Sequence, residues 1–139
     1  GKKLGVIGLG AVGVQLGTRF LVAKECGVHQ NYKNKVLKAN DIATMTTGKR
    51  LGHPVRSIKN PYTKEYFRLE YSSISDEELE AYGRGALRRA AVEGDEKTGC
   101  FLAGQIAGMV NREQPAKEII EEIFREAEDV LNGATKWVK

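Results

Sequence analysis

The glycine-rich opening, GKKLGVIGLGAVGVQLGTRF, constrains the fold more than any other stretch because two phosphate-binding patterns overlap in it. The segment Gly8–Gly13 has the spacing G-x-G-x-x-G, which binds a dinucleotide when it joins a strand to a helix. The segment Gln15–Thr18 places a glycine and a hydroxyl residue after a β-leaning run, which suits a phosphate-binding turn. The first pattern needs a helix where the second needs a strand, so the two predict different folds.

The dinucleotide pattern is supported upstream and fails downstream. Lys3–Ile7 predicts a short buried strand, and residues 1–13 resemble the start of the NAD-binding domain of D-2-hydroxyacid dehydrogenases. However, Val12–Leu16 predicts a second strand, and the positions about 20 residues beyond the glycines carry no acid for a ribose. A small NAD-binding module therefore stays open as an alternative, carried by Gly8, Gly10 and Gly13.

The composition is that of an ordinary globular protein. The chain has 139 residues, enough for one domain, with 41% hydrophobic and 29% charged residues. No apolar run is long enough to span a bilayer, and five glycines from Gly5 to Gly17 interrupt what would be a signal-peptide core. We therefore expect a cytoplasmic protein that does not bind membranes. Cys26 and Cys100 predict free thiols, and His29 and His53 share no ligand spacing, so no metal site is predicted.

The charges are unevenly distributed along the chain. Residues 1–60 carry 11 Lys or Arg against 2 Asp or Glu, whereas residues 61–139 carry 11 against 16. A basic first half suits the phosphates of a cofactor or an acidic protein partner. The basic residues are scattered without interleaved aromatic residues, so nucleic acid is not expected as a partner.

Residues 28–70 combine one helical pattern with several short β-leaning ones. Apolar residues over Val28–Ala39 recur at helical spacing in a polar stretch, which predicts a surface helix. From residue 41 to residue 70 we expect an irregular excursion with short strands, interrupted by glycine and proline. The β-leaning stretches are Thr44–Thr47, Pro54–Ile58 and Tyr66–Leu69.

Helical patterns dominate the remainder of the chain. Ser75 and Glu78 form a capping box that predicts a helix start, followed by apolar positions on one face as far as Ala90. The run Phe101–Val110 is almost entirely apolar and predicts a short buried helix, in which Gly104 and Gly108 allow close backbone approach. The last helix is expected to begin at Pro115 and to end at Asn132-Gly133.

Beyond the glycine pattern, a series of ordered motifs resembles one family of flavin-dependent enzymes. Leu9–Leu21 is similar to the eighth-strand region of the enoyl-acyl-carrier-protein reductases of type II and the nitronate monooxygenases (2-nitropropane dioxygenases). The resemblance continues in order to the end of the chain, over about residues 9–139. The further matching motifs are Val22–Cys26, Thr47–Lys49, Gly52–Arg56, Gly83–Arg88, Glu93–Asp95, Ala103–Gly108 and Pro115–Ile120.

This resemblance implies an α/β fold, the C-terminal portion of a TIM (β/α)8 barrel, because a whole barrel needs about 200 residues or more. The chain is then a single partial domain over 1–139. Its expected parts are a foreign-looking strand start (1–8), a strand with a phosphate loop and a helix (9–40), the short-strand excursion (41–70) and C-terminal helices (71–139). The resemblance assigns FMN as cofactor, with NAD(P)H as reductant. The FMN-binding residues that it implies are Gln15, Leu16, Gly17, Thr18, Gly104 and Gln105.

In the reductase branch, the resemblance implies that hydride passes from NAD(P)H through FMN to an enoyl thioester. In the other branch, a nitronate is oxidised with oxygen. The expected partner is a small-molecule or acyl-carrier-protein-linked substrate, with a homodimer as a possible assembly.

No residue is predicted as a catalytic acid or base. His53 is interpreted as a turn residue, and Arg19 and Arg56 as solvated or ion-paired. A second alternative is a non-catalytic helical interaction fragment.

Overall fold

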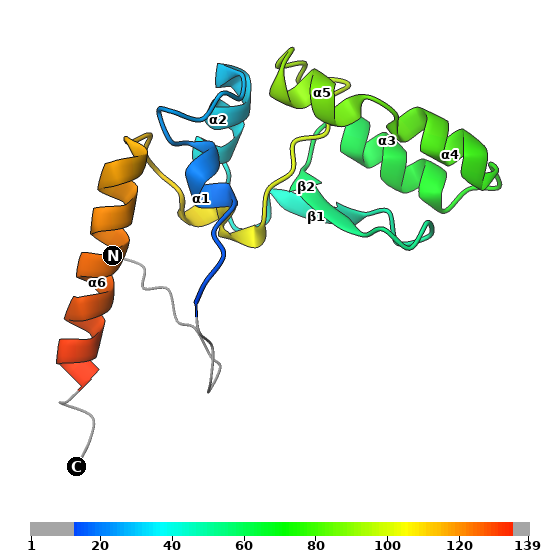
Figure 1. Cartoon of the computed structure of the whole chain (residues 1–139). Helices are drawn as coiled ribbons and strands as arrows, with labels where there is room; N and C mark the ends of the chain where they lie inside the picture. The colour runs from blue at the N-terminus through cyan, green and yellow to red at the C-terminus, as the bar shows by residue number, and fades with distance from the viewer. Residues whose placement is uncertain (1–12, 135–139) are drawn as a thin grey trace.

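A computed structural model describes residues 13–134 of the chain (Figure 1). The predicted strand Lys3–Ile7, two of the three fingerprint glycines and the foreign-looking start at 1–8 lie outside the described residues. The elements in chain order are α1 (Thr18–Leu21), α2 (Gln30–Leu37), β1 (Thr44–Thr47), β2 (Val55–Ile58), α3 (Pro61–Glu70), α4 (Asp76–Gly83), α5 (Ala86–Ala91), the 3₁₀ helix η1 (Gln105–Met109) and α6 (Ala116–Ala134).

The elements fall into three spatial groups, which Figure 1 shows side by side. The hairpin of β1 and β2 lies with α3, α4 and α5 at one end, α1, α2 and η1 lie in the middle, and α6 stands at the other end. In the hairpin, Thr44 pairs with Ile58 and Thr47 with Val55 in antiparallel register. This is the one sheet that the described residues form.

The predicted strand over Val12–Leu16 is wrong for the part that the structure describes. Residues 13–16 are neither strand nor helix, and α1 begins only at Thr18. A strand exists only when a neighbouring strand supplies hydrogen-bond partners, and within residues 13–134 the ladder joins β1 and β2 alone. The local β preference of this stretch is therefore present without the partner that would make it a strand.

The β-leaning stretch Tyr66–Leu69 is likewise not a strand, because it lies inside α3. The helix begins at a strong local signal. The Asn60 side chain accepts a hydrogen bond from the Thr63 amide at 2.8 Å, and Pro61 occupies the first helical turn. Tyr62 and Tyr66 then point to the same side and pack on Tyr82 of α4. Helix capping and packing override the β preference of the aromatic residues.

The predicted buried helix over Phe101–Val110 is wrong in its first half. Phe101 to Gly104 is extended and follows the β2 edge, where the Ile58 amide donates to the Phe101 carbonyl at 2.8 Å and the Ala103 amide to the Arg56 carbonyl at 3.1 Å. Only Gln105–Met109 coils, as a 3₁₀ helix. The close approach expected at Gly108 is confirmed, since a Cβ there would lie 2.7 Å from the Asn40 carbonyl carbon.

The predicted start at Ser75 and the predicted final helix are both confirmed, but the helix that follows Ser75 is shorter than predicted. The capping box exists, since the Glu78 amide donates to the Ser75 hydroxyl at 3.2 Å and the Ser75 amide to the Glu78 carboxylate at 2.8 Å. The helix that follows does not run on to Ala90 but breaks at Gly85, whose φ is +75°. The final helix begins at Ala116, one residue after Pro115.

The extended segment Cys100–Ala103 runs between two buried clusters. Phe101 is fully buried against α2, where its ring meets the Tyr32 ring edge-on at 5.0 Å between centroids. Cys100 belongs to the second cluster, with Tyr62 and Ala86. Both cysteines are free thiols, as predicted, and burial raises the pKa of the Cys100 thiol. Successive side chains of this segment therefore pack into opposite clusters, and this fixes the path of the backbone that leads to Gly104.

Two absences are established for residues 13–134. None of the helices there has both the length and the apolar character needed to cross a membrane. The same part of the chain holds no group of three or more His, Cys, Asp or Glu side chains suited to a metal ion.

Candidate functional site

The loop Gln15–Thr18 leads from the extended start of the described chain into α1. Gly17 is the N-cap residue, and its carbonyl accepts hydrogen bonds from the amides of Phe20 at 3.0 Å and Leu21 at 3.3 Å. The amides of Gly17 and Thr18 precede these bonds, so helix geometry leaves them as donors. The loop therefore presents adjacent backbone N–H groups, which is the arrangement that an anion needs.

Gly17 faces open space, and its backbone does not require glycine. A Cβ at this position would meet nothing within 4 Å, and the residue is exposed. Its φ of −98° lies in a region that any residue adopts. The described part of the chain thus gives no internal reason for a glycine here, and the open space leaves room for a ligand to approach the backbone.

Thr18 connects this loop to the second predicted segment. Its hydroxyl oxygen accepts a hydrogen bond from the Gly104 amide at 2.9 Å, although the two residues are 86 positions apart. A hydroxyl that accepts one bond still has its own proton to donate. Gln105 follows directly, begins η1 and is exposed. The predicted helix over Phe101–Val110 is not formed around it, so Gln105 is not buried within an apolar helix.

The six residues predicted to bind the cofactor do not all lie on one surface. Gln15 is exposed beside Gly17 and Thr18. Leu16 lines a groove of about 590 Å³ between α1, η1 and α6. Among the six, Thr18 and Gly104 are bonded to each other, and Gly17 and Gln105 adjoin them in sequence.

The far side of α1 is tied to the segment that precedes α6. The Arg19 guanidinium donates to the side-chain oxygen of Gln114, and the Lys24 amide donates to the Gln114 carbonyl at 2.9 Å. Burial is the main cause that lowers the pKa of Arg19. Neither Arg19 nor Arg56 forms an ion pair within the described residues. Arg56 instead donates to the Thr44 hydroxyl at 3.2 Å.

A buried lysine on α2 supports the same region. Lys33 is 4% exposed, and its ammonium group donates to the Ala23 carbonyl at 2.7 Å and to the Glu113 carboxylate at 2.9 Å. This bond lowers the pKa of Glu113. Sequence reasoning missed Lys33 because the stretch looked polar. The available signal was its position three residues before the buried Val36, on one helix face.

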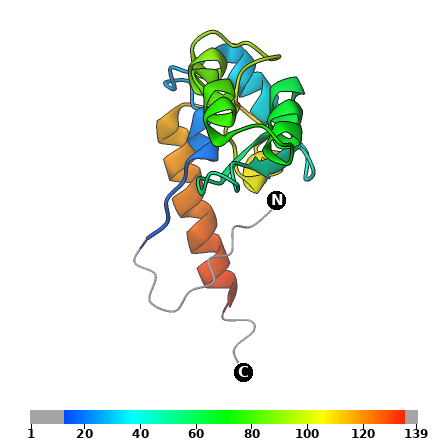
Figure 2. The same ribbon diagram turned by 90° about the vertical axis from the view of Figure 1, so that its right-hand side faces the viewer.

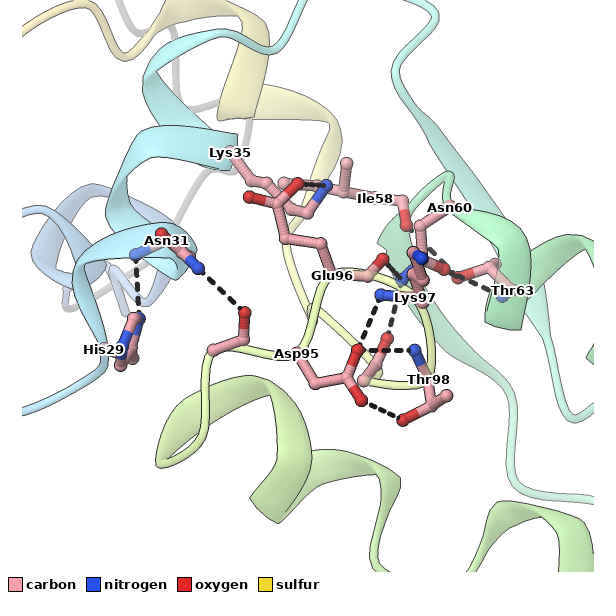
Figure 3. A network of polar contacts seen from close by, with 12 residues as sticks. His29, Asn31, Lys35, Ile58, Asn60, Thr63, Asp95, Glu96, Lys97 and Thr98 are labelled. Carbon is pink, nitrogen blue, oxygen red and sulfur yellow. Dashed lines mark hydrogen bonds and ion pairs between the residues drawn. The ribbon is translucent and has the colours of Figure 1, made fainter.

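The loop 94–99, which precedes the extended segment Cys100–Ala103, is held in place by a network of hydrogen bonds (Figure 3). Asp95 closes the loop on itself, accepting from the amides of Lys97 at 2.8 Å and Thr98 at 3.1 Å. The bonds to Thr98, first that of its hydroxyl, lower the pKa of Asp95. Asn31 of α2 donates to the Gly94 carbonyl at 2.9 Å, and Asn60 donates to the Gly99 carbonyl at 2.7 Å. Side chains from α2 and from the start of α3 thus hold the loop on two sides.

The two histidines have structural positions. His29 is exposed, and its Nδ1 caps α2 by accepting a hydrogen bond from the Asn31 amide at 3.1 Å. The imidazole also covers Gly94, where an added Cβ would lie 2.1 Å from Nδ1. His53 lies in the β1–β2 turn, and its amide donates to the Gly48 carbonyl at 3.0 Å, which agrees with its interpretation as a turn residue.

Comparison with known sequences matches the chain to one family. The family model of nitronate monooxygenase covers residues 4–126, and so includes part of the opening segment. A probable nitronate monooxygenase of Staphylococcus saprophyticus is 30% identical over 125 residues, which are 89% of this chain and 35% of that protein. A nitronate monooxygenase of Neurospora crassa is 28% identical over 131 residues, 91% of this chain and 34% of that protein.

Comparison with solved structures gives the same assignment. FabK from Thermotoga maritima is similar with a TM-score of 0.83 and 37% identity, over 88% of this chain and 39% of FabK. A mutant of the same enzyme is similar with a TM-score of 0.78, over 93% of this chain and 38% of the mutant. The predicted fold class, α/β and part of a barrel flavoenzyme, is confirmed. The chain spans little more than a third of the length of these relatives.

Proposed function

Because the chain belongs to the nitronate monooxygenase family, we propose that it provides the FMN phosphate-binding part of an oxidoreductase of enoyl-acyl-carrier-protein reductase II or nitronate monooxygenase type. One observation carries the proposal. The two segments assigned to the cofactor, Gln15–Thr18 and Gly104-Gln105, are joined by the hydrogen bond from the Gly104 amide to the Thr18 hydroxyl. A ligand on this bond contacts both segments at once.

The residues present fit the phosphate end of FMN. Two backbone amides and one hydroxyl, from Gly17 and Thr18, supply donors on a side of the loop that a Cβ at Gly17 would not crowd. The exposed amides of Gln15 and Gln105 flank these donors. Phosphate oxygens accept several hydrogen bonds, so a cluster of neutral donors at close range suits them.

If FMN is bound in the whole enzyme, it would supply the redox chemistry, either hydride transfer from NAD(P)H to an enoyl thioester or oxidation of a nitronate by oxygen. The proposed role of this chain is narrower. Gly17 and Thr18 bind and orient the phosphate, and the Thr18 contact with Gly104 holds the loop at a fixed distance from η1. We assign no acid or base to the described residues and expect no enoyl-thioester reduction by this chain alone. The proposed setting is cytoplasmic, in a homodimer acting on a small or carrier-linked substrate.

The test is a titration of the purified chain with FMN and with riboflavin, read by flavin fluorescence. Phosphate recognition predicts that FMN binds at least about tenfold tighter than riboflavin, since charge-assisted hydrogen bonds are the strong ones. Gly17→Trp fills the open side of the loop and is expected to abolish this preference. Gly27→Trp is the matched control, because Gly27 is also exposed, with nothing within 4 Å of its Cβ position.

Equal affinity for FMN and riboflavin would contradict the phosphate assignment. Binding of NADH that is lost on Gly8→Ala or Gly10→Ala would favour the dinucleotide alternative instead. That alternative is weakened by residues 13–16, which do not form the helix that the fingerprint requires. Binding of neither ligand would favour the interaction fragment.

A further inference from the structure

Helix α2 lies against both of the segments that the proposed function brings together. Helices α1, α2 and η1 contact one another, and both views show them within the body of the described chain, from which α6 projects (Figures 1 and 2). Thr18 begins α1, and Gly104 directly precedes η1. Side chains of α2 that reach these two elements can therefore set the distance between Thr18 and Gly104.

Two consecutive residues of α2, Tyr32 and Lys33, each donate a hydrogen bond toward one of these segments. The Tyr32 hydroxyl donates to the Leu102 carbonyl at 2.7 Å, and the Lys33 ammonium group donates to the Ala23 carbonyl at 2.7 Å. Both side chains are buried. Consecutive positions of a helix are separated by about 100° around its axis, so the pair reaches two different elements. Helix α2 is thus bonded to the chain just after α1 and to the chain just before Gly104.

The peptide group that follows Leu102 is held at both of its polar atoms. Its carbonyl oxygen accepts the hydrogen bond from Tyr32, and its N–H donates to the Arg56 carbonyl of β2 at 3.1 Å. The next N–H along the chain is that of Gly104, which donates to the Thr18 hydroxyl at 2.9 Å. Because peptide groups are planar, only the two backbone dihedrals of one residue separate the fixed group from the amide that meets Thr18.

The Tyr32 side chain is itself fixed by packing. Its ring meets the buried Phe101 ring edge-on, at 5.0 Å between centroids, in the first hydrophobic cluster. Burial raises the pKa of Tyr32 well above its ordinary value, so the hydroxyl keeps its proton at neutral pH. The hydroxyl therefore remains a donor to the Leu102 carbonyl.

We propose that Tyr32 is a positioning residue for the phosphate loop, because its hold on the Leu102 carbonyl fixes the Gly104 amide against the Thr18 hydroxyl. The Gly104 amide occupies one acceptor position of that hydroxyl, which restricts the directions in which the hydroxyl donates its own proton. Tyr32 acts through this bond and does not itself contact the phosphate. The effect on a ligand rests on the proposed function, whereas the effect on the Gly104 amide can be measured without any ligand.

The first experiment measures hydrogen exchange of individual backbone amides by NMR in the chain without ligand. Tyr32→Phe keeps the buried ring and removes only the hydroxyl. Exchange of the Gly104 amide is expected to rise about threefold to tenfold relative to the Cys100 amide, the range of one neutral hydrogen bond. The Cys100 amide is the internal reference, since it donates to the Ala86 carbonyl at 2.9 Å in the second cluster. Tyr62→Phe is the matched control, because Tyr62 is 7% exposed and belongs to that second cluster.

The second experiment asks whether Tyr32 acts on the phosphate through the bond between Thr18 and Gly104. Tyr32→Phe is expected to lower the preference for FMN over riboflavin about threefold to tenfold, whereas Tyr62→Phe leaves it unchanged. In a Thr18→Val background, which already lacks the bond, Tyr32→Phe should have no further effect on this preference. A residue that only stabilises the fold would lower the affinities for both flavins by the same factor in both backgrounds.

Three results would overturn the proposal. The first is a Gly104 exchange rate that Tyr32→Phe leaves unchanged, and the second is a rise that the Cys100 amide shares equally. The third is a loss of FMN preference that adds in full to the loss caused by Thr18→Val. If the wild-type chain binds FMN and riboflavin equally, the proposed function fails, while the exchange of the Gly104 amide still decides whether Tyr32 positions it.

Discussion

The contact between Thr18 and Gly104 and the exposed apolar residues of α6 represent two ways of building a surface. Around Thr18 and Gly104, buried side chains and hydrogen bonds from α2, α3 and the loop 94–99 fix the backbone from several sides. Along α6, the apolar residues recur at helical spacing, yet only Ile119 is buried in the described chain. The first region is determined by contacts within residues 13–134, whereas the second has the composition of an interface. Stability effects should therefore be large near the first region and small along the second.

The largest effect is expected from one substitution made in both regions. Phe101→Ala removes a fully buried ring at the centre of the first cluster and should lower the free energy of unfolding by about 3–5 kcal/mol. Phe124→Ala removes a ring that is 67% exposed and should change it by less than about 0.5 kcal/mol. Urea unfolding followed by circular dichroism measures both. Comparable losses would mean that α6 is packed in the isolated chain.

The buried Lys33 should give the next largest effect. Lys33→Met keeps the apolar stem but leaves the Ala23 carbonyl without its donor, and should cost about 2–3 kcal/mol. Lys35→Met is the control, because the ion pair of Lys35 with the half-exposed Glu96 should contribute less than about 1 kcal/mol. Chemical unfolding of both variants at pH 7 makes the comparison.

The same variant sharpens the comparison through pH. Lys33 lowers the pKa of Glu113 in the folded protein, so the stability from this pair is present above the unfolded pKa and is lost as pH falls through the folded pKa. Below about pH 4.3, the ordinary value for Glu, the wild-type chain should lose stability more steeply than the Lys33→Met variant. Parallel pH profiles would show that the pair does not stabilise the fold.

Gly94 should rank third. A Cβ there would overlap the His29 imidazole, and the φ of +63° is unfavourable for alanine. Gly94→Ala should therefore cost about 2 kcal/mol, of which roughly half is the backbone term. Gly52→Ala isolates that term, since Gly52 has a φ of +74° and nothing within 4 Å of its Cβ position. Thermal unfolding of the two variants separates the cost of backbone strain at a positive φ from the cost of displacing the His29 imidazole. If the two melting temperatures fell by the same amount, the contact of His29 with Gly94 would not stabilise the fold.

Local signals in the sequence predicted some of these features and missed others for identifiable reasons. The capping box at Ser75 and the final helix depend on residues within a few positions of each other, and both were predictable. The extended path of Phe101 to Gly104 depends on pairing with β2, more than 40 residues earlier in the chain, so an apolar run alone indicated a helix. The Thr18 and Gly104 positions followed from a family resemblance, but their hydrogen bond is a tertiary contact that no local pattern encodes.

Thr18 is expected to contribute less to stability than Phe101, Lys33 or Gly94, but its substitution is the most informative about function. Thr18→Val keeps the shape of the side chain but removes the acceptor of the Gly104 amide and a donor of the loop, and should cost about 1 kcal/mol in unfolding free energy. Thr18→Ser retains the hydroxyl and should lose little. If the loop binds a phosphate, Thr18→Val should also weaken FMN by about tenfold while riboflavin binding is unchanged, because the lost donor faces the phosphate alone. A loss of stability without any change in the FMN preference would make Thr18 a structural link between the two segments. If the affinity for FMN and the affinity for riboflavin fell equally, the hydrogen bond between Thr18 and Gly104 would act on the flavin ring through η1. It would then not act on the phosphate through the loop.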